Sequence, residues 1–177
     1  MISLGGYEYI KTKYAQKDSL KEAENIIKNE PIEPASLKDV PFDPKQGDVV
    51  GILEIPKITA KLPIVEGTDE DDLERGVGHY KGTAYPLGKD QIVLSGHRDT
   101  VFRRMGELKI GDVLILQLSY GNFTYKIEST KVVDADDLSI IVPTAPEEVL
   151  TVTTCYPFSY VGDAPDRYII TAKPVAK

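Results

Sequence analysis

The chain has 177 residues, a length that suits one domain with an additional segment, and its composition of 41% hydrophobic and 28% charged residues is typical of a soluble globular protein. Its net charge of −7 argues against a nucleic-acid partner, because binding to phosphates requires a basic surface. The single cysteine, Cys155, excludes an internal disulfide, and no stretch approaches the roughly 20 continuous apolar residues of a membrane span.

The first segment is predicted to be an amphipathic helix over residues 7–29, since its apolar residues recur at steps of three and four. Asp18 or Ser19 could instead begin a second, shorter helix. We expect this segment to pack on the body rather than to form a stalk or a regulatory cover. Four prolines in the next fourteen residues favour an extended connector. Two parts are therefore expected: residues 1–45 with the helix and connector, and residues 46–177 with the main domain.

From residue 47 onward, short β-type runs alternate with turns. Helical turns are expected at 69–75 and 101–108, and Tyr120-Gly121-Asn122 indicates a hairpin. The number and spacing of the runs favour an all-β sandwich or closed barrel, because the strand–helix alternation of a parallel sheet is missing. The eight predicted strands are 48–58, 61–66, 78–85, 91–97, 112–119, 123–133, 149–155 and 167–173.

Three residues of this domain together supply what thiol acyl transfer requires. Cys155 ends a run of largely β-branched residues, and a thiol at that place can act as a nucleophile. His97 can donate a proton to the leaving amine, and the permanently charged Arg167 can stabilise an oxyanion. Arg167 opens the strand that follows Cys155, so the two residues can be neighbours. The residues alone leave open a transferase, a thiol hydrolase and a non-catalytic β-domain with a buried thiol.

Several ordered motifs give the chain a resemblance to the sortases. Residues 151–155, Thr-Val-Thr-Thr-Cys, resemble the Thr-Leu-x-Thr-Cys signature, with Val152 in place of the usual leucine. The segment 155–167 most resembles class D, since it leaves no room for the long class B insertion. Phe42-Asp43-Pro44 holds residues of the class C lid in a different order, so we predict no lid. Further matches lie at 51–58, 62–67, 76–80, 95–100 and 167–170, and the resemblance spans residues 47–173.

The resemblance implies a fold, a reaction and a location. It implies an eight-stranded sortase-type β-barrel with short helices or 3-10 turns and an N-terminal helical appendage. Sortases are transpeptidases of Gram-positive cell surfaces that cleave a Leu-Pro-x-Thr-Gly-like (LPxTG-like) sorting signal after Thr and form a thioester. An amine, usually that of the peptidoglycan precursor lipid II, then takes the acyl group. Carried over by position, Cys155 is the nucleophile, His97 the acid/base, and Arg167 stabilises the oxyanion or holds substrate. Sortases usually have an N-terminal membrane anchor, which we expect upstream of Met1.

Three further residues are candidates for substrate binding. Thr154 can offer its hydroxyl or backbone to the pocket, and Arg98 can support His97. Asp99 could orient His97 as in a triad, although capping of a turn is favoured. The second histidine, His79, matches a non-catalytic position of the family.

No metal or cofactor is predicted from the motifs. The sequence has no phosphate-binding glycine loop and no Cys/His cluster. The acidic runs at 69–72 and 134–137 could bind calcium through carboxylates. Solvated turns and charge at helix N-termini are the favoured interpretation.

Overall fold

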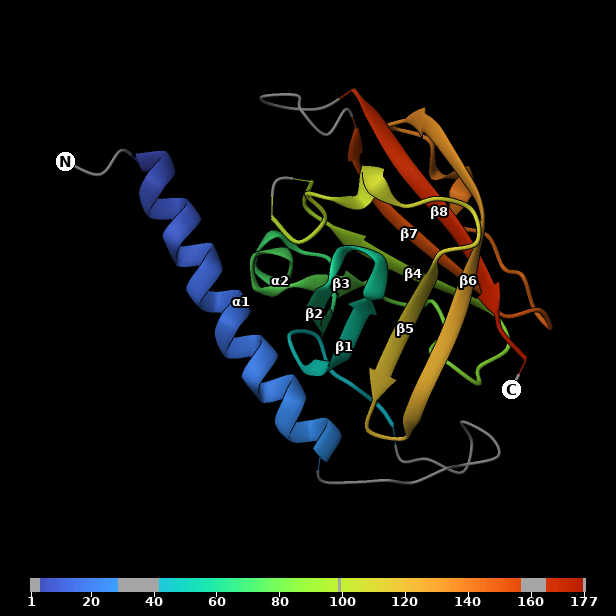
Figure 1. The fold of residues 1–177 in the computed structure, drawn as a ribbon, viewed down its shortest axis with the longest axis horizontal. Coiled ribbons are helices and arrows are strands. Elements are labelled where there is room, and N and C mark those ends of the chain that lie inside the picture. Colours follow the sequence, from blue (N-terminus) through green and yellow to red (C-terminus); the bar gives the residue numbers. More distant parts are fainter. Residues whose placement is uncertain (1–3, 29–41, 99, 157–164, 177) are drawn as a thin grey trace.

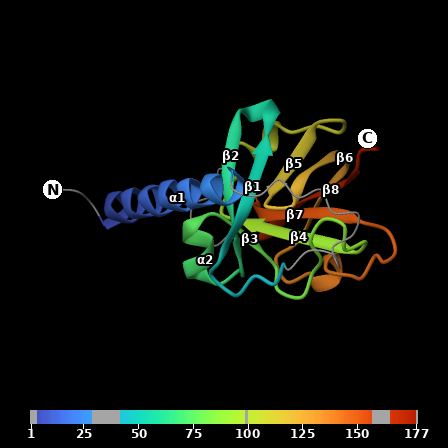
Figure 2. The same ribbon diagram turned by 90° about the horizontal axis from the view of Figure 1, so that it is seen from below.

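The computed structural model describes residues 4–28, 42–98, 100–156 and 165–176. In these residues eight strands form a closed barrel in the order β1-β2-β3-β4-β7-β8-β6-β5 (Figures 1 and 2). The predicted all-β barrel is therefore confirmed. The strands are β1 Val49–Ile55, β2 Ala60–Glu66, β3 Val77–His79, β4 Gln91–Gly96, β5 Val113–Leu118, β6 Gly121–Asp134, β7 Val149–Tyr156 and β8 Asp166–Pro174.

Two α-helices and three 3-10 turns accompany these strands in the described part of the chain. The helices are α1 Leu4–Lys28 and α2 Glu70–Arg75, and the 3-10 turns are η2 Pro56–Ile58, η3 Met105–Glu107 and η4 Leu138–Ile140. Neither α1 nor α2 combines the length and apolar character needed to cross a bilayer.

Apolar side chains fill the inside of the barrel, and the alternation along each strand explains how they reach it. In β5 every second residue is buried, as the period of two requires. The segment predicted as a helical turn at 101–108 places Val101, Phe102, Met105 and Leu108 in the same core. Its only helical part is η3, because residues 101–104 form hydrogen-bonded turns instead.

Helix α1 lies on the outside of the barrel against β1 and β2 (Figures 1 and 2). Its C-terminal half buries Ala23 completely and packs Leu20 and Ile27 around Val49 and Val65. The helix runs through Asp18 and Ser19 without a break, so it is one helix and not two. The predicted domain boundary near residue 45 stays a prediction, since the connector at 29–41 is not among the described residues.

The strand predicted at 78–85 is wrong beyond its first residues, because β3 ends at His79. The chain turns there. The hydroxyl of Thr83 donates to the carbonyl of Tyr80 at 2.8 Å, and Gly82 adopts a positive φ of 89°. Glycine adopts this conformation readily, so the turn suits the sequence.

Candidate active site

Cys155 and Arg167 lie directly opposite each other in neighbouring strands. Strands β7 and β8 are antiparallel, and their register pairs Cys155 with Arg167. Opposite residues of such a pair have Cα atoms about 5 Å apart. Arg167 is partly buried, and its Nη1 donates to the carbonyl of Asp166 at 3.1 Å. The register therefore places the residue of the predicted nucleophile directly opposite the residue of the predicted guanidinium.

His97 reaches the same end of the sheet through the other neighbour of β7. Strand β4 runs parallel to β7, and Gly96 pairs with Thr154 at the end of the register. The residues that follow this pair along the sequence are His97 and Cys155, and neighbouring strands lie about 4.8 Å apart. The three predicted catalytic positions thus lie at one end of three adjacent strands: Cys155 on β7, Arg167 on β8 and His97 directly after β4.

The period of two assigns a face of the barrel wall to these positions. Val152 of β7 and Ile170 of β8 are paired and belong to the barrel core. Positions 154 and 168 follow on the same inner face, so positions 155 and 167 fall on the outer face.

The segment that carries His97 is held by a contact that sequence reasoning missed. The ring of Phe102 is fully buried, and the Phe102 N–H donates to the carbonyl of His97 at 3.0 Å. A Cβ added to Gly96 would lie 2.5 Å from two ring carbons of Phe102. Only glycine therefore lets the ring pack against β4 directly beside His97. The apolar pattern of 101–108 indicated that Phe102 is buried but not what it contacts.

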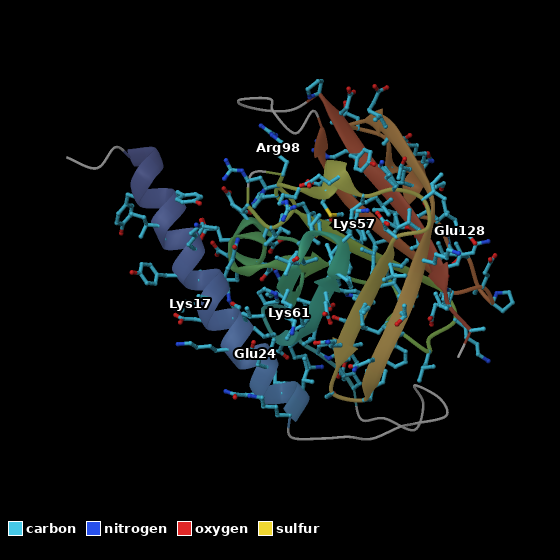
Figure 3. All side chains as sticks on the ribbon, viewed as in Figure 1. Lys17, Glu24, Lys57, Lys61, Arg98 and Glu128 are labelled. Atoms are coloured by element: carbon cyan, nitrogen blue, oxygen red, sulfur yellow. The ribbon has the colours of Figure 1, made fainter. Side chains whose placement is uncertain are left out.

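The predicted substrate-binding residues are only partly located. Thr154 is 3% exposed, and its hydroxyl has no hydrogen-bond partner in the described part of the chain. Arg98 lies in the turn after His97, and its side chain extends away from the barrel (Figure 3). Asp99 lies outside the described residues. The roles assigned to these three residues stay predictions.

The other histidine, His79, belongs to a buried network. Its Nε2 donates to the carbonyl of Ala84 at 2.8 Å, and its Nδ1 lies 2.7 Å from Oε2 of Glu66. The hydroxyl of Tyr85 donates a hydrogen bond to the same carboxylate of Glu66. The rings of Tyr85 and His79 are stacked, with their centroids 3.9 Å apart. Burial, followed by the hydrogen bond to Glu66, raises the pKa of the Tyr85 hydroxyl far above its usual range. Both nitrogens of His79 are engaged, which matches a structural role.

The two acidic runs contribute carboxylates to helix starts. Asp69 and Asp72 form a capping box at the N-terminus of α2, where the Asp69 N–H donates to Asp72 Oδ2 at 3.2 Å. Asp137 accepts from the Ser139 N–H at 2.9 Å at the start of η4. Three carboxylates of the two runs, those of Asp69, Asp72 and Asp137, thus have partners within the protein, and the absence of a metal or cofactor stays a prediction.

Comparisons with known proteins identify the family of the chain. The profile of the sortase domain family matches residues 53–175. The chain is 57% identical to Sortase D of Bacillus subtilis (strain 168), with 97% of this chain and 90% of that protein covered. It is 34% identical to Sortase SrtE1 of Streptomyces coelicolor, with coverages of 66% and 38%.

Two solved structures are similar to most of this chain. The Clostridium perfringens Sortase D5 transpeptidase has a TM-score of 0.77 and 27% identity, with 92% of this chain and 99% of that chain covered. The catalytic domain of Bacillus anthracis SrtD has a TM-score of 0.64 and 45% identity, with coverages of 77% and 94%. The family match, the sequence identities and the barrel together lead to one conclusion: the chain belongs to the sortase family and is a homologue of the class D enzymes.

Proposed function

We propose that this enzyme cleaves an LPxTG-like sorting signal after Thr and transfers the resulting acyl group to an amine of lipid II or peptidoglycan. It acts at the outer surface of the cytoplasmic membrane of a Gram-positive bacterium. The observation that supports this best is the register of β4, β7 and β8, which brings Cys155 next to Arg167 and next to the position of His97.

In the first half of the reaction, the thiolate of Cys155 attacks the carbonyl carbon of the substrate Thr. The oxygen becomes negative, and the guanidinium of Arg167 stabilises it without giving up a proton. Protonated His97 donates its proton to the leaving nitrogen, and the Thr–Gly bond breaks. The products are a thioester between the substrate Thr and Cys155 and a released carboxy-terminal fragment of the signal, which begins with Gly and carries a free amine.

In the second half, the acceptor amine attacks the thioester carbon. Neutral His97 takes the proton from the attacking nitrogen, and the Cys155 thiolate leaves with the electron pair of the C–S bond. The new amide joins the protein to the acceptor, and His97 is again protonated. The cycle consumes no water and restores both residues.

Transfer and hydrolysis share the thioester, so product analysis has to separate them. The description of the similar C. perfringens protein as a transpeptidase favours transfer. Wild-type protein is incubated with an LPxTG peptide with and without an added amine, and products are identified by mass spectrometry. Transfer predicts an amide product that requires the amine. A free acid in both reactions would show a hydrolase and contradict the proposal.

Thiol labelling tests whether Cys155 is the reactive group of the enzyme. A catalytic Cys155 is expected to react with iodoacetamide in the native protein at a rate that depends on pH. Labelling that occurs only after denaturation would indicate a buried, unreactive thiol and would count against catalysis.

A further inference from the structure

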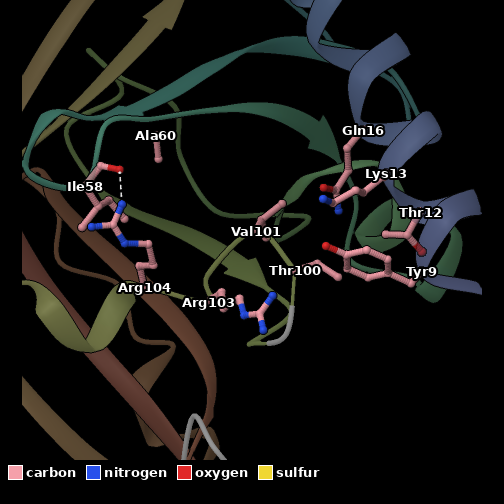
Figure 4. Close-up of a pocket in the computed structure, with 10 residues that line it drawn as sticks. All are labelled: Tyr9, Thr12, Lys13, Gln16, Ile58, Ala60, Thr100, Val101, Arg103 and Arg104. Carbon is pink, nitrogen blue, oxygen red and sulfur yellow. Dashed lines mark hydrogen bonds between the residues drawn. The ribbon is translucent and has the colours of Figure 1, made fainter. Parts of the chain in front are cut away.

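A cavity of about 280 Å³ lies between α1 and the segment that follows His97 (Figure 4). On one side it is lined by the N-terminal half of α1, whose apolar side chains do not belong to the packed contact with β1 and β2. On the other side it is lined by Ile58 of η2, by Ala60 of β2 and by side chains of residues 100–104. The residues that matter for its chemistry are Tyr9, Lys13, Gln16, Thr100, Arg103 and Arg104.

The cavity is positively charged within a chain whose net charge is −7. It is lined by one lysine and two arginines and by no described carboxylate. Arg104 is neutralised, because its Nε and Nη2 donate to Glu107 at 2.6 and 3.1 Å. For Lys13 and Arg103, the structure records no ion pair with any carboxylate that it describes. Two cations therefore face this space without a counter-charge from the described residues.

The positive charges of Lys13 and Arg103 both affect the hydroxyl of Tyr9. Lys13 Nζ lies 4.7 Å from the centroid of the Tyr9 ring. A hydrogen bond from Lys13, followed by the charges of Lys13 and Arg103, lowers the pKa of the Tyr9 hydroxyl. Figure 4 shows the side chains of Tyr9, Lys13 and Gln16 extending from α1 toward the segment with Thr100 and Arg103. Lys13 on α1 and Arg103 in the segment after β4 thus both act on the Tyr9 hydroxyl.

Two buried polar atoms of the same cavity lack partners. Gln16 Nε2 and Thr100 Oγ1 are buried and make no hydrogen bond within the described chain. A buried donor without an acceptor is costly, and proteins rarely retain one without a reason. Both residues line the same cavity, so an acceptor group bound there would find two donors that have no partner among the described residues.

We propose that this cavity is a binding site for an anionic group, a phosphate or a carboxylate. Lys13 and Arg103 supply the charge, and the Gln16 amide and the Thr100 hydroxyl donate hydrogen bonds to the remaining oxygens. Arg103 suits this role, because a guanidinium matches the planar spacing of two anion oxygens. The bound group bridges α1 to the segment that begins at His97. The site is separate from the thioester chemistry and does not require it.

The test uses the Cys155→Ala chain, so that binding is measured without turnover. Inorganic phosphate and acetate are each titrated at constant ionic strength, and amide shifts are followed by NMR. Saturable shifts are expected at Gln16, Thr100 and Arg103. Lys13→Gln and Arg103→Gln are each expected to weaken binding about tenfold, since each removes a charge-assisted hydrogen bond. Lys28→Gln, at the other end of α1, is the matched control and is expected to bind as the parent does.

Vesicles identify the source of the anion. Phosphatidylglycerol vesicles that retain the parent chain but not the Lys13→Gln/Arg103→Gln double variant would assign the group to a lipid headgroup. If the vesicles retain neither the parent nor the double variant, while soluble phosphate or acetate binds saturably, the anionic group belongs to a small soluble ligand. The proposal is overturned if no probe gives saturable shifts, or if the folded double variant binds as tightly as the parent.

Discussion

The close approach of Gly96 to the Phe102 ring makes Gly96→Ala a direct test of how the His97 segment is held. The new Cβ would lie 2.5 Å from Cδ2 and Cε2 of Phe102 and 2.8 Å from Cγ2 of Val101. Favourable carbon contacts begin near 3.5 Å, so the ring has to move by about 1 Å. Because Phe102 is fully buried, it has no solvent to move into. Overpacking of this kind costs about 1–3 kcal/mol.

We expect Gly96→Ala to lower the free energy of unfolding by about 2 kcal/mol, as measured by urea denaturation. We also expect the rate of thioester formation to fall by about 100-fold. The Phe102 N–H donates a hydrogen bond to the His97 carbonyl, so a shift of Phe102 also shifts His97, and a displacement of about 1 Å can cost a catalytic group a factor of about 100 in rate. Phe102→Leu removes the ring, so the double variant should regain part of the loss. The reasoning is refuted if Gly96→Ala unfolds and reacts like the wild type, or if the two substitutions are strictly additive.

Three further predictions concern charge and buried polar groups. Arg167→Gln should slow acyl-enzyme formation about 100-fold or more, while Lys126→Gln on β6 should leave it unchanged; equal rates would contradict the oxyanion role. Glu66→Gln should lower the free energy of unfolding by about 3 kcal/mol, because it removes the carboxylate that faces His79. The folded fraction of this variant should still form the acyl-enzyme at the wild-type rate. A slower rate in the folded fraction would be evidence against a purely structural network. Backbone N–H hydrogen bonds lower the pKa of Asp90 below its ordinary 3.8, so its contribution to stability is full above that pH and disappears as the pH falls through the lowered value. Urea titrations of wild type and Asp90→Asn should therefore differ at pH 7 and converge at low pH; a difference independent of pH would refute this.

The barrel strands could be predicted because the signal for each is local. Strand β7 was recognised from the β-branched run that ends at Cys155, and β5 from its alternation of apolar residues. The strand predicted at 78–85 failed for the opposite reason. The side chains of His79 and Tyr85 are fixed by Glu66 from another strand, and such a long-range contact has no local pattern.

The site was predictable to different degrees. The neighbourhood of Cys155 and Arg167 followed from two strands joined by one loop, which favours an antiparallel pair. The placement of His97 depends on the parallel pairing of β4 with β7, which the residues alone do not reveal. The choice of His97 as the acid/base came from the resemblance to the sortases. The packing of Phe102 on Gly96 was missed, since periodicity predicts that a side chain is buried but not what it meets.

The most direct test of the central claim is to locate the acyl group on the enzyme. Wild-type chain, Cys155→Ala and His97→Ala are each incubated with an LPxTG peptide, and the digested proteins are mapped by tandem mass spectrometry. The account predicts a thioester-linked fragment ending in Thr on Cys155 of the wild type, none on Cys155→Ala and little on His97→Ala. An adduct on another residue, or equal yields in wild type and His97→Ala, would contradict it.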